Sequence, residues 1–475
     1  MMGMNQSRIG LALLLLGVLM TIALVLSLAP VRNRGTDLSG LWEGTLEFPG
    51  FESRMAFRVS MQPGGVLAAS LLFPDQGDRE IPADTVRLKD RELRIDVGAV
   101  GGSFTGSVDP ELKSITGRWR QGRWSHNVAL KRVTEIRRPP RPQTPQSPFP
   151  YEVVEITFRN DAAGASFAGS LTLPPGDGPF PAALLISGGG AQDRDCTFLW
   201  HRPFLVVADH LTRHGIAVLR VDDRGVGEST GDRTQATSAD FAEDALAAVA
   251  YLKPHPKIDA KRIGLIGHSE GGIIASLAAA ESPAIAFIVM LASPGLPGRE
   301  YHHQFEASSG RALGLDEQTI AAKRDLQERI FAALLNESDL AATEAEVRRI
   351  LRENDPTLPA ERLETAVARF CSPWFRFSLA HDPGATIAAV SCPILALFAA
   401  RDVQVPPSGN AEAMKRTLQG AGHPDFTVAV LPDLNHFFQT CQTGAPVEYG
   451  RIEETFAPAA LRRMTAWILD HTPDP

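Results

Sequence analysis

Cysteine and basic charge are both scarce in this sequence, and each shortage excludes a class of function. The four cysteines among 475 residues are widely spaced and form neither a C-x-x-C pair nor a Cys/His cluster with metal-ligand spacing. We therefore expect buried thiols with at most one disulfide, no metal and no cofactor. The net charge is −8, whereas binding to nucleic-acid phosphates needs a concentrated basic face. Nucleic acid is thus not expected as a partner.

Hydrophobic residues make up 44% of the chain and charged residues 21%, values typical of a globular protein with a large core. One long uncharged run stands out, at residues 9–29 directly after Arg8. Its length would reach about 31 Å as a helix, close to the thickness of a bilayer. We expect residues 1–30 to be a signal peptide, or else an uncleaved anchor that gives the only membrane contact. Both alternatives place the rest of the chain on the periplasmic or extracellular face, in the second case anchored to the inner membrane.

Residues 37–135 consist of short segments that alternate apolar and polar positions between Gly-rich and Asp-Pro turns. This pattern predicts an all-β domain, either an antiparallel sandwich or a lipocalin-like barrel. It contains no convincing catalytic constellation, which favours a folding, docking or assembly role over ligand binding. Residues 136–150 are rich in proline and predict a stiff, extended linker.

From residue 151 to residue 475, apolar strand segments alternate with helical segments, a pattern typical of a mostly parallel sheet covered by helices on both faces. Ligands of such sheets bind beyond the carboxyl ends of the strands. Residues 297–390 interrupt the alternation with amphipathic helical segments and no strand pattern. We expect this insertion to be a helical cap above the strand ends. The predicted strands are 151–158, 166–173, 181–187, 216–221, 262–267, 285–292, 394–399 and 426–431.

Gly267–Gly271 (GHSEG) fits the G-x-S-x-G pattern of a nucleophile elbow, in which a serine sits on a tight turn between a strand and a helix. The apolar strand segment before it and the helix of small residues after it supply the context that the pattern needs. Gly267 and Gly271 are expected because the chain on both sides approaches too closely for a Cβ atom. Ser269 is therefore the candidate nucleophile, and the alternative is a Gly-rich turn whose serine caps the helix.

A serine nucleophile needs a base within hydrogen-bond reach, and that base needs an orienting acid. In this kind of fold the three follow in the order serine, acid, histidine. Asp402 ends the strand that begins at residue 394, and His436 follows the last predicted strand, so both are expected at the same edge as Ser269.

A Gly-rich loop, Gly188–Gly190, follows the strand that ends at residue 187. Backbone N–H groups without side chains can face a developing oxyanion, and Gly189 is the chosen donor, paired with the N–H of Glu270. A flexible turn with no donor role is the alternative. Asp223 and Arg224 follow another strand and are expected to brace neighbouring loops through ion pairs.

An aromatic cluster lies at residues 371–377, near the end of the insertion. Trp374 and Phe375 are candidates for lining an acyl pocket. The alternative is that the cluster only forms the seam between a cap and its core.

Four motifs together resemble one known group of enzymes. They are 186–195 (ISGGGAQDRD), 223–227 (DRGVG), 267–271 (GHSEG) and 372–375 (SPWF). From about residue 37 to its end, the chain resembles bacterial α/β-hydrolase carboxylesterases of the EstD-like group, related to serine aminopeptidase-type (S33) hydrolases. It departs from them at Gly189–Ala191, where relatives often carry Ser-Gly-Pro. The resemblance implies hydrolysis of short-chain acyl esters of small molecules.

The predicted function is therefore that of a serine esterase using Ser269, His436 and Asp402 through an acyl-enzyme. One alternative is a serine peptidase or aminopeptidase with the same triad. The other is an exported binding protein that kept the fold without its chemistry. The sequence carries no signal for an oligomeric state.

Overall fold

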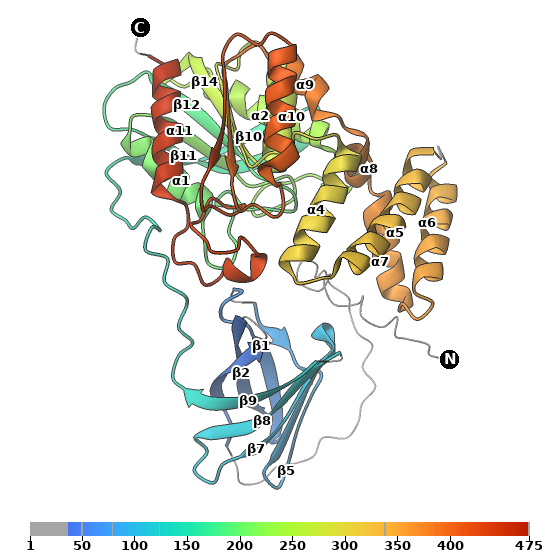
Figure 1. The fold of residues 1–475 in the computed structure, drawn as a ribbon. Coiled ribbons are helices and arrows are strands. Elements are labelled where there is room, and N and C mark those ends of the chain that lie inside the picture. The colour runs from blue at the N-terminus through green and yellow to red at the C-terminus, as the bar shows by residue number, and fades with distance from the viewer. Residues whose placement is uncertain (1–36, 49–50, 78, 123, 337–338, 474–475) are drawn as a thin grey trace.

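The computed structural model describes residues 37–48, 51–77, 79–122, 124–336 and 339–473. Figure 1 shows a sheet domain below, an α/β domain above it and a group of helices beside the α/β domain. The predicted export segment at residues 9–29 lies outside the described residues. Within the described ranges, no helix is both long and apolar enough to cross a membrane.

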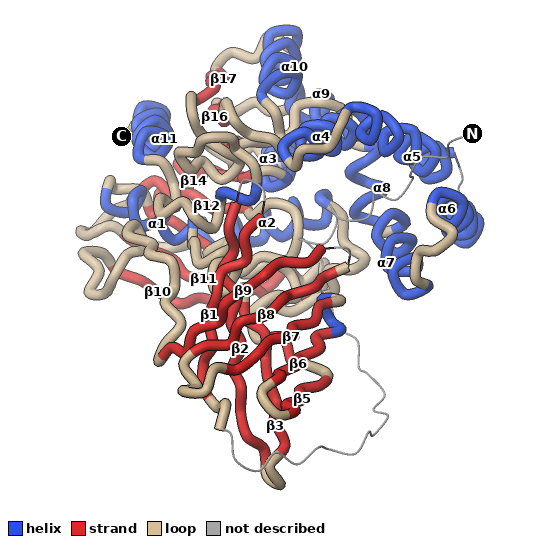
Figure 2. The backbone as a smooth tube through the Cα atoms, turned by 60° about the horizontal axis from the view of Figure 1, so that its bottom comes forward, coloured by secondary structure: helices blue, strands red, loops and turns tan. Residues whose placement is uncertain are grey.

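The amino-terminal domain is one antiparallel sheet with the order β4-β3-β2-β1-β9-β8-β7-β6-β5. The sandwich alternative is wrong, because these strands bond in a single sheet rather than in two packed sheets. The sheet curls so that its ends approach each other (Figure 2). Ala83 and Asp84 connect the two end strands of the sheet. The N–H of Ala83 donates to the carbonyl of Ala69 in β3, and the N–H of Asp84 donates to the carbonyl of Asp96 in β6. The strands are β1 (Gly40–Phe48), β2 (Phe51–Gln62), β3 (Val66–Leu72), β4 (Ile81–Pro82), β5 (Thr85–Lys89), β6 (Glu92–Val97), β7 (Gly102–Val108), β8 (Ser114–Gln121) and β9 (Trp124–Val133).

Alternate side chains of this sheet fill an apolar core on its concave side, as period-two sequence patterns require. Trp42, Phe57, Phe104 and Trp119 are all fully buried there. The ring of Phe57 lies 5.7 Å from that of Phe104 and 6.3 Å from that of Trp119, measured between centroids. The end strands β4 and β5 were not predicted, because they are too short to show a clear alternation.

The linker at residues 136–150 lies against the α/β domain along part of its length. Arg141 donates from its guanidinium to the carbonyl oxygens of Leu199 and Gly450, both at 2.8 Å. The guanidinium of Arg138 lies over the ring of Trp200, 4.2 Å from its centroid. Trp200 in turn donates from Nε1 to the carbonyl of Pro74 in the sheet domain at 2.8 Å. The predicted spacer is thus docked onto the α/β domain through Arg138 and Arg141, and Trp200, which Arg138 contacts, bonds in turn to the sheet domain.

The α/β domain has an eight-stranded sheet with the order β10-β11-β13-β12-β14-β15-β16-β17. All neighbours from β13 to β17 pair in parallel, and β10 and β11 form an antiparallel hairpin at one side. The predicted mostly parallel sheet is confirmed, with strand ends within a few residues of those expected. The strands are β10 (Glu152–Asn160), β11 (Ala165–Leu173), β12 (Phe180–Ile186), β13 (Ala217–Val221), β14 (Ile258–His268), β15 (Ile288–Leu291), β16 (Ile394–Ala399) and β17 (Phe426–Leu431).

Helices cover both faces of this sheet and give the domain two apolar cores, in the arrangement of the α/β-hydrolase fold. Helices α1 (Pro203–Arg213) and α11 (Pro458–His471) pack on one face. Helices α2 (Ser238–Leu252), α3 (Glu270–Glu281) and α10 (Pro407–Gly420) pack on the other. Buried on both faces, the strands are almost continuously apolar, which is why the sequence predicted them well.

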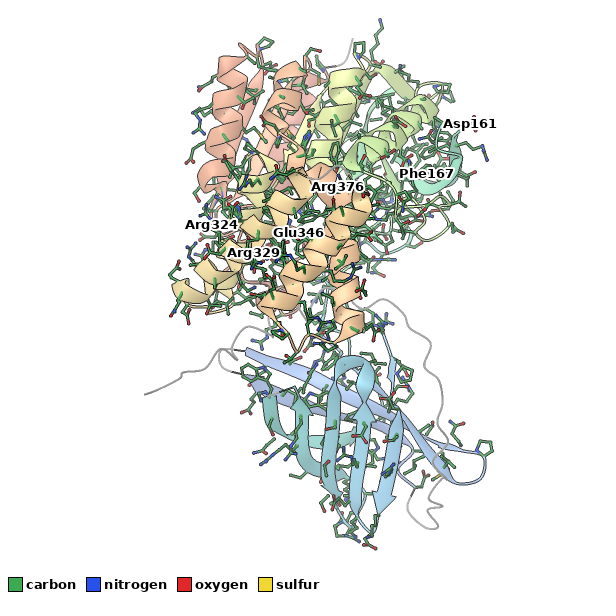
Figure 3. The ribbon with its side chains drawn as sticks, turned by 90° about the vertical axis from the view of Figure 1, so that its right-hand side faces the viewer. Asp161, Phe167, Arg324, Arg329, Glu346 and Arg376 are labelled. Carbon is green, nitrogen blue, oxygen red and sulfur yellow. The ribbon has the colours of Figure 1, made fainter. Side chains whose placement is uncertain are left out.

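The insertion between β15 and β16 is helical, as predicted. Its outer part has a small core of its own, built from residues such as Phe331, Val347 and Val367. Arg324 and Arg329, labelled in Figure 3, are exposed on the outer surface of these helices. The helices are α4 (Gly298–Ala312), α5 (Glu317–Asn336), α6 (Leu340–Asn354), α7 (Ala360–Cys371), α8 (Pro373–Ala380) and α9 (Pro383–Ala389).

The four cysteines are free thiols, and three of them are buried. The single disulfide that the sequence allowed is therefore not formed.

Candidate active site

Ser269 occupies a sharp turn between the end of β14 and the start of α3. Its backbone has φ 56° and ψ −121°, outside the regions that a residue with a side chain ordinarily adopts. The Ser269 N–H donates to the carbonyl of Leu291 in the neighbouring strand at 2.8 Å. The strained turn predicted from GHSEG is thus present and is fixed from the adjacent strand.

The glycines on either side of this turn have a steric reason. A Cβ atom on Gly267 would lie 2.0 Å from the carbonyl oxygen of Gly271. A Cβ atom on Gly271 would lie 2.2 Å from the carbonyl oxygen of Ile186 in β12. Both distances are far below van der Waals contact, so any side chain at either position would displace backbone.

Asp402 and His436 meet through a direct hydrogen bond, although 34 residues separate them. His436 Nδ1 lies 2.8 Å from Asp402 Oδ2, and both residues are buried. The other oxygen of Asp402 accepts the N–H groups of Gln404 at 2.7 Å and Val405 at 2.9 Å. A carboxylate fixed in this way holds the proton of a neutral imidazole on Nδ1 and leaves Nε2 free to accept one.

His268, the residue before Ser269, connects the elbow to the loop of His436. Its Nε2 lies 2.9 Å from the carbonyl oxygen of His436, and the two rings are 4.7 Å apart. Burial lowers the pKa of His268 to about 3, so His268 is neutral and can donate from Nε2. Ser269 and His436 share no hydrogen bond in the described part of the chain. Such contacts are often long without substrate and tighten when it binds.

The Gly188–Gly190 loop lies directly beside the elbow. A Cβ atom on Gly188 would approach Cβ of Ser269 to 3.1 Å, and one on Gly189 would approach Oε2 of Glu270 to 3.3 Å. Glu270 is the first residue of α3, so its N–H has no acceptor within the helix. The structure therefore brings together the two residues proposed from the sequence as oxyanion donors.

The side chain of Glu270 is a feature that sequence reasoning missed, since only its N–H had been considered. It is buried, and Oε1 accepts hydrogen bonds from Ser238 Oγ at 2.7 Å and from Trp374 Nε1 at 2.6 Å. Burial raises the pKa of this carboxyl. Glutamate side chains are far more often exposed on the surface than buried. No sequence pattern therefore pointed to a buried, hydrogen-bonded carboxyl group at this position.

Trp374 and Phe375, the candidate pocket residues, have different positions. Trp374 reaches the elbow through its bond to Glu270. Phe375 is buried inside the insertion, with its ring 5.3 Å from that of Phe370 and 6.1 Å from that of Phe331. Phe375 therefore contributes to the packing of the insertion, the alternative that the sequence left open.

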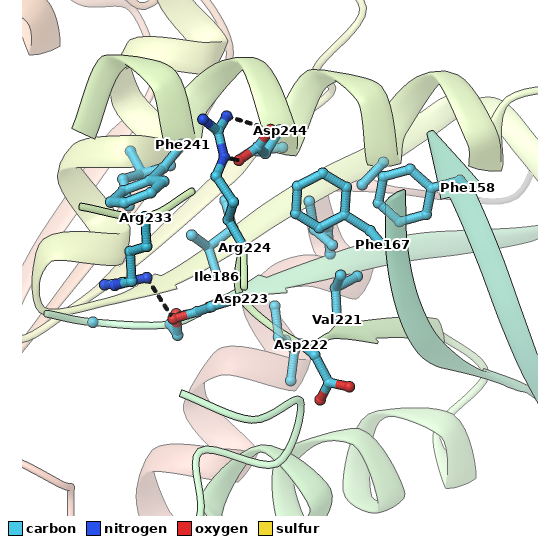
Figure 4. A pocket seen from close by; sticks show the side chains of 17 residues that line it. Phe158, Phe167, Ile186, Val221, Asp222, Asp223, Arg224, Arg233, Phe241 and Asp244 are labelled. Atoms are coloured by element: carbon cyan, nitrogen blue, oxygen red, sulfur yellow. Dashed lines mark hydrogen bonds and ion pairs between the residues drawn. The ribbon is translucent and has the colours of Figure 1, made fainter. Parts of the chain in front are cut away.

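Asp223 and Arg224 brace loops through ion pairs, as predicted. Asp223 contacts Arg233 at 3.1 Å and accepts a hydrogen bond from Ser187, while Arg224 forms an ion pair with Asp244 at 2.8 Å (Figure 4). Burial raises the pKa of Asp223 to about 6. These pairs border a cavity of about 70 Å³ that extends along α2 behind the Gly-rich loop.

A buried polar network that the sequence did not reveal supports the loop of His436. The side chain of Asn435 accepts the N–H groups of Phe437 and Gln439, and Gln439 Nε2 lies 3.0 Å from His201 Nε2. His201 also contacts Thr455 through Nδ1 at 2.9 Å. His201 is more than 200 residues from its partners Gln439 and Thr455, so no local motif could have identified the network.

Comparison with known proteins identifies a family to which the sequence is similar. Residues 202–439 match the family described as "Serine aminopeptidase, S33". The chain is 28% identical over 282 residues to "Esterase EstD" of Thermotoga maritima, covering 59% of this chain and 60% of that protein. It is 32% identical over 129 residues to "Esterase FrsA" of Escherichia fergusonii, covering 27% of this chain and 29% of that protein. The chain thus spans less than two thirds of either relative.

Among solved structures, the "Alpha/beta hydrolase GrgF" from Penicillium sp. sh18 matches with a TM-score of 0.42 and 20% identity. That match covers 68% of this chain and 99% of the GrgF chain.

Proposed function

The chain belongs to the serine aminopeptidase (S33) family, and from that premise we propose that it is a serine hydrolase that cleaves short-chain carboxylic esters. One observation carries the proposal. The strained turn at Ser269 and the buried pair of Asp402 and His436 follow the carboxyl ends of the parallel strands β14, β16 and β17. His268 joins the turn to the loop of His436. The name of the relative EstD supports an ester as the substrate.

The mechanism follows from the groups at this edge. His436 Nε2 takes the proton of the Ser269 hydroxyl as its oxygen attacks the acyl carbonyl, while Asp402 stabilises the imidazolium. The N–H groups of Gly189 and Glu270 donate to the oxyanion of the tetrahedral intermediate. His436 then gives its proton to the departing alcohol, leaving an acyl-enzyme. Water repeats the sequence, with His436 as base, and releases the acid and free Ser269.

We propose that the helical insertion acts as a cap over this edge. Two contacts support this role. The hydroxyl of Ser308 in α4 donates to the carbonyl of Val403, next to Asp402, at 2.6 Å. Trp374 in α8 bonds to Glu270. The first helix of the insertion is thereby attached beside Asp402, and its aromatic end is attached beside Ser269.

Export by residues 9–29 remains part of the proposal, with the enzyme outside the cytoplasm either released or anchored. Fractionation of cells expressing the full chain tests it, and recovery in the cytosolic fraction would contradict it.

The curled sheet domain is proposed to act in docking or assembly, because its core is filled by side chains such as Trp42 and Trp119.

The test of the nucleophile is Ser269→Ala. We expect kcat/KM for p-nitrophenyl acetate and butyrate to fall by at least about 10³-fold, because nothing else in the site supplies the attacking oxygen. A fluorophosphonate probe followed by peptide mapping should label Ser269 in the parent protein. Ser276→Ala is the matched control, since the Ser276 hydroxyl donates to the carbonyl of Ile273 within α3. Activity retained in Ser269→Ala would refute the nucleophile.

A peptidase or aminopeptidase activity is the second candidate, favoured by the description of the matched family. Turnover of aminoacyl anilides compared with short acyl esters separates the two. If the purified protein fails to react with the probe and with both substrate classes, the binding-protein alternative holds instead.

A further inference from the structure

The side chain of Glu270 joins three parts of the candidate site. It accepts one bond from Ser238 of α2 and another from Trp374 of α8, and it lies against Gly189 of the Gly-rich loop. It is 8% exposed. No step of the proposed mechanism uses this carboxyl group, although it belongs to the residue next to the nucleophile.

The hydrogen bonds of Glu270 are distributed unevenly between its two oxygens. Oε1 accepts both donors, from Ser238 and Trp374. Oε2 is buried and has no hydrogen-bond partner among the described residues. An ionised carboxylate left this way would keep a buried charged oxygen without a donor, which is strongly unfavourable. A neutral acid removes the charge from this oxygen, because Oε1 then acts as the carbonyl oxygen and accepts both bonds while Oε2 carries the proton.

The charged groups around Glu270 favour the same state. Arg233 is the nearby cation, but it is already engaged by Asp223 and by the carbonyl of Gly190. The Asp223 carboxylate also faces Glu270, from the loop after β13, whereas the Tyr301 hydroxyl that faces it from α4 is uncharged. A negative charge on Glu270 would in addition oppose the oxyanion that is proposed to form at Gly189.

We propose that Glu270 is a positioning residue that works as a neutral acid, holding the cap through Trp374 and presenting the Oε2 hydroxyl toward Gly189. The inference rests on the proposed function, because it concerns the same oxyanion site. When Glu270 loses its proton, a negative charge appears beside the oxyanion and activity falls. Burial raises the pKa of Glu270, so the protonated form extends to higher pH than for an exposed glutamate.

The pH dependence of kcat/KM in four proteins tests this role. The parent should show an alkaline loss of activity. Glu270→Leu should lose at least about 100-fold in kcat/KM, because the bonds to Ser238 and Trp374 disappear. Glu270→Gln should recover most of that loss and lack the alkaline limb, since an amide reproduces the neutral acid and does not titrate. Trp374→Phe should move the limb to higher pH, because a lost donor to Oε1 disfavours the ionised form.

Two further measurements complete the test. Glu281→Gln, at the exposed end of the same helix, is the control and should keep the profile of the parent. Infrared spectroscopy should show a protonated carboxyl band in the parent that is lost in Glu270→Gln, whether or not an ester is hydrolysed. This readout separates the inference from the proposed function. The proposal that Glu270 works as a neutral acid is refuted if Glu270→Gln is as inactive as Glu270→Leu, if it keeps the alkaline loss of activity, or if it keeps the infrared band.

Discussion

At the scale of single residues, the candidate site depends on one proton being held on the correct nitrogen. Asp402 cannot rotate freely, because one of its oxygens accepts two backbone N–H groups while the other accepts from His436 Nδ1. The pair is buried, which strengthens the interaction relative to water. The orientation of His436 is therefore set by a carboxylate that is itself fixed.

Asp402→Asn should lower kcat by about 10³- to 10⁴-fold and leave the fold intact. The amide can donate to Nδ1 and so favours the tautomer in which Nε2 already carries a proton. Steady-state kinetics with p-nitrophenyl butyrate and a thermal melt measure the two effects. Asp433→Asn is the control, since Asp433 lies in the loop of His436 but pairs with Arg401 at the surface. Equal loss in both variants would contradict the assignment of Asp402.

At the scale of elements, Ser269, Asp402 and His436 all lie in turns or loops rather than within helices or strands, and each loop is tied to its neighbours. The loop after β17 is the longest of them and has little regular structure. Its order comes from the buried amides of Asn435 and Gln439, which bond to each other at 2.9 Å and to surrounding backbone. A loop held by such a network can keep an imidazole in place without a helix beneath it.

Gln439→Ala should therefore reduce both stability and catalysis. It removes the bonds to Asn435, Glu454 and His201 and leaves buried groups unpaired, at a cost of about 2 to 3 kcal/mol in the free energy of unfolding. We expect kcat to fall about tenfold with little change in KM, measured beside urea denaturation. Gln442→Ala, at an exposed position of the same loop, should change neither. An unchanged kcat in Gln439→Ala would show that this network does not hold His436 in place.

At the scale of the whole molecule, the linker between the sheet domain and the α/β domain is bound to the α/β domain and is not a free spacer. Arg141 binds two carbonyl oxygens of the α/β domain, and Trp200 reaches from that domain to Pro74. Polar contacts of this kind hold a segment in place but bury little apolar surface. The linker is therefore the part where a single substitution should loosen the assembly without unfolding either domain.

Arg141→Ala should make residues 136–150 easier to cleave. The loss of two hydrogen bonds loosens the segment, which is then held to the α/β domain by Gln143 and its bonds to Thr455 and Phe456, and proteolysis follows the population of open states. Limited proteolysis with mass spectrometry of the fragments measures the rate, which we expect to rise several-fold. Arg137→Ala is the control, because the Arg137 side chain is exposed and forms an ion pair with Glu135 of the same segment. Identical cleavage of the two variants would show that the bonds of Arg141 do not hold the linker.

The sequence by itself determined the features that depend on local pattern. Continuous apolar strands indicated a parallel sheet buried on both faces, and GHSEG indicated a turn too tight for side chains at Gly267 and Gly271. The ends of the strands placed Asp402 and His436 at one edge. Each of these follows from periodicity or from steric limits within a few residues.

Tertiary structure alone decided which distant polar groups meet. The burial of Glu270, its bond to Trp374 and the contact of Gln439 with His201 join segments more than 100 residues apart. It also decided that Phe375 packs inside the insertion and that the sheet domain is a single curled sheet. The physical reason is that hydrogen bonding and burial of a polar side chain depend on which elements surround it, and that environment is not written in the neighbouring sequence.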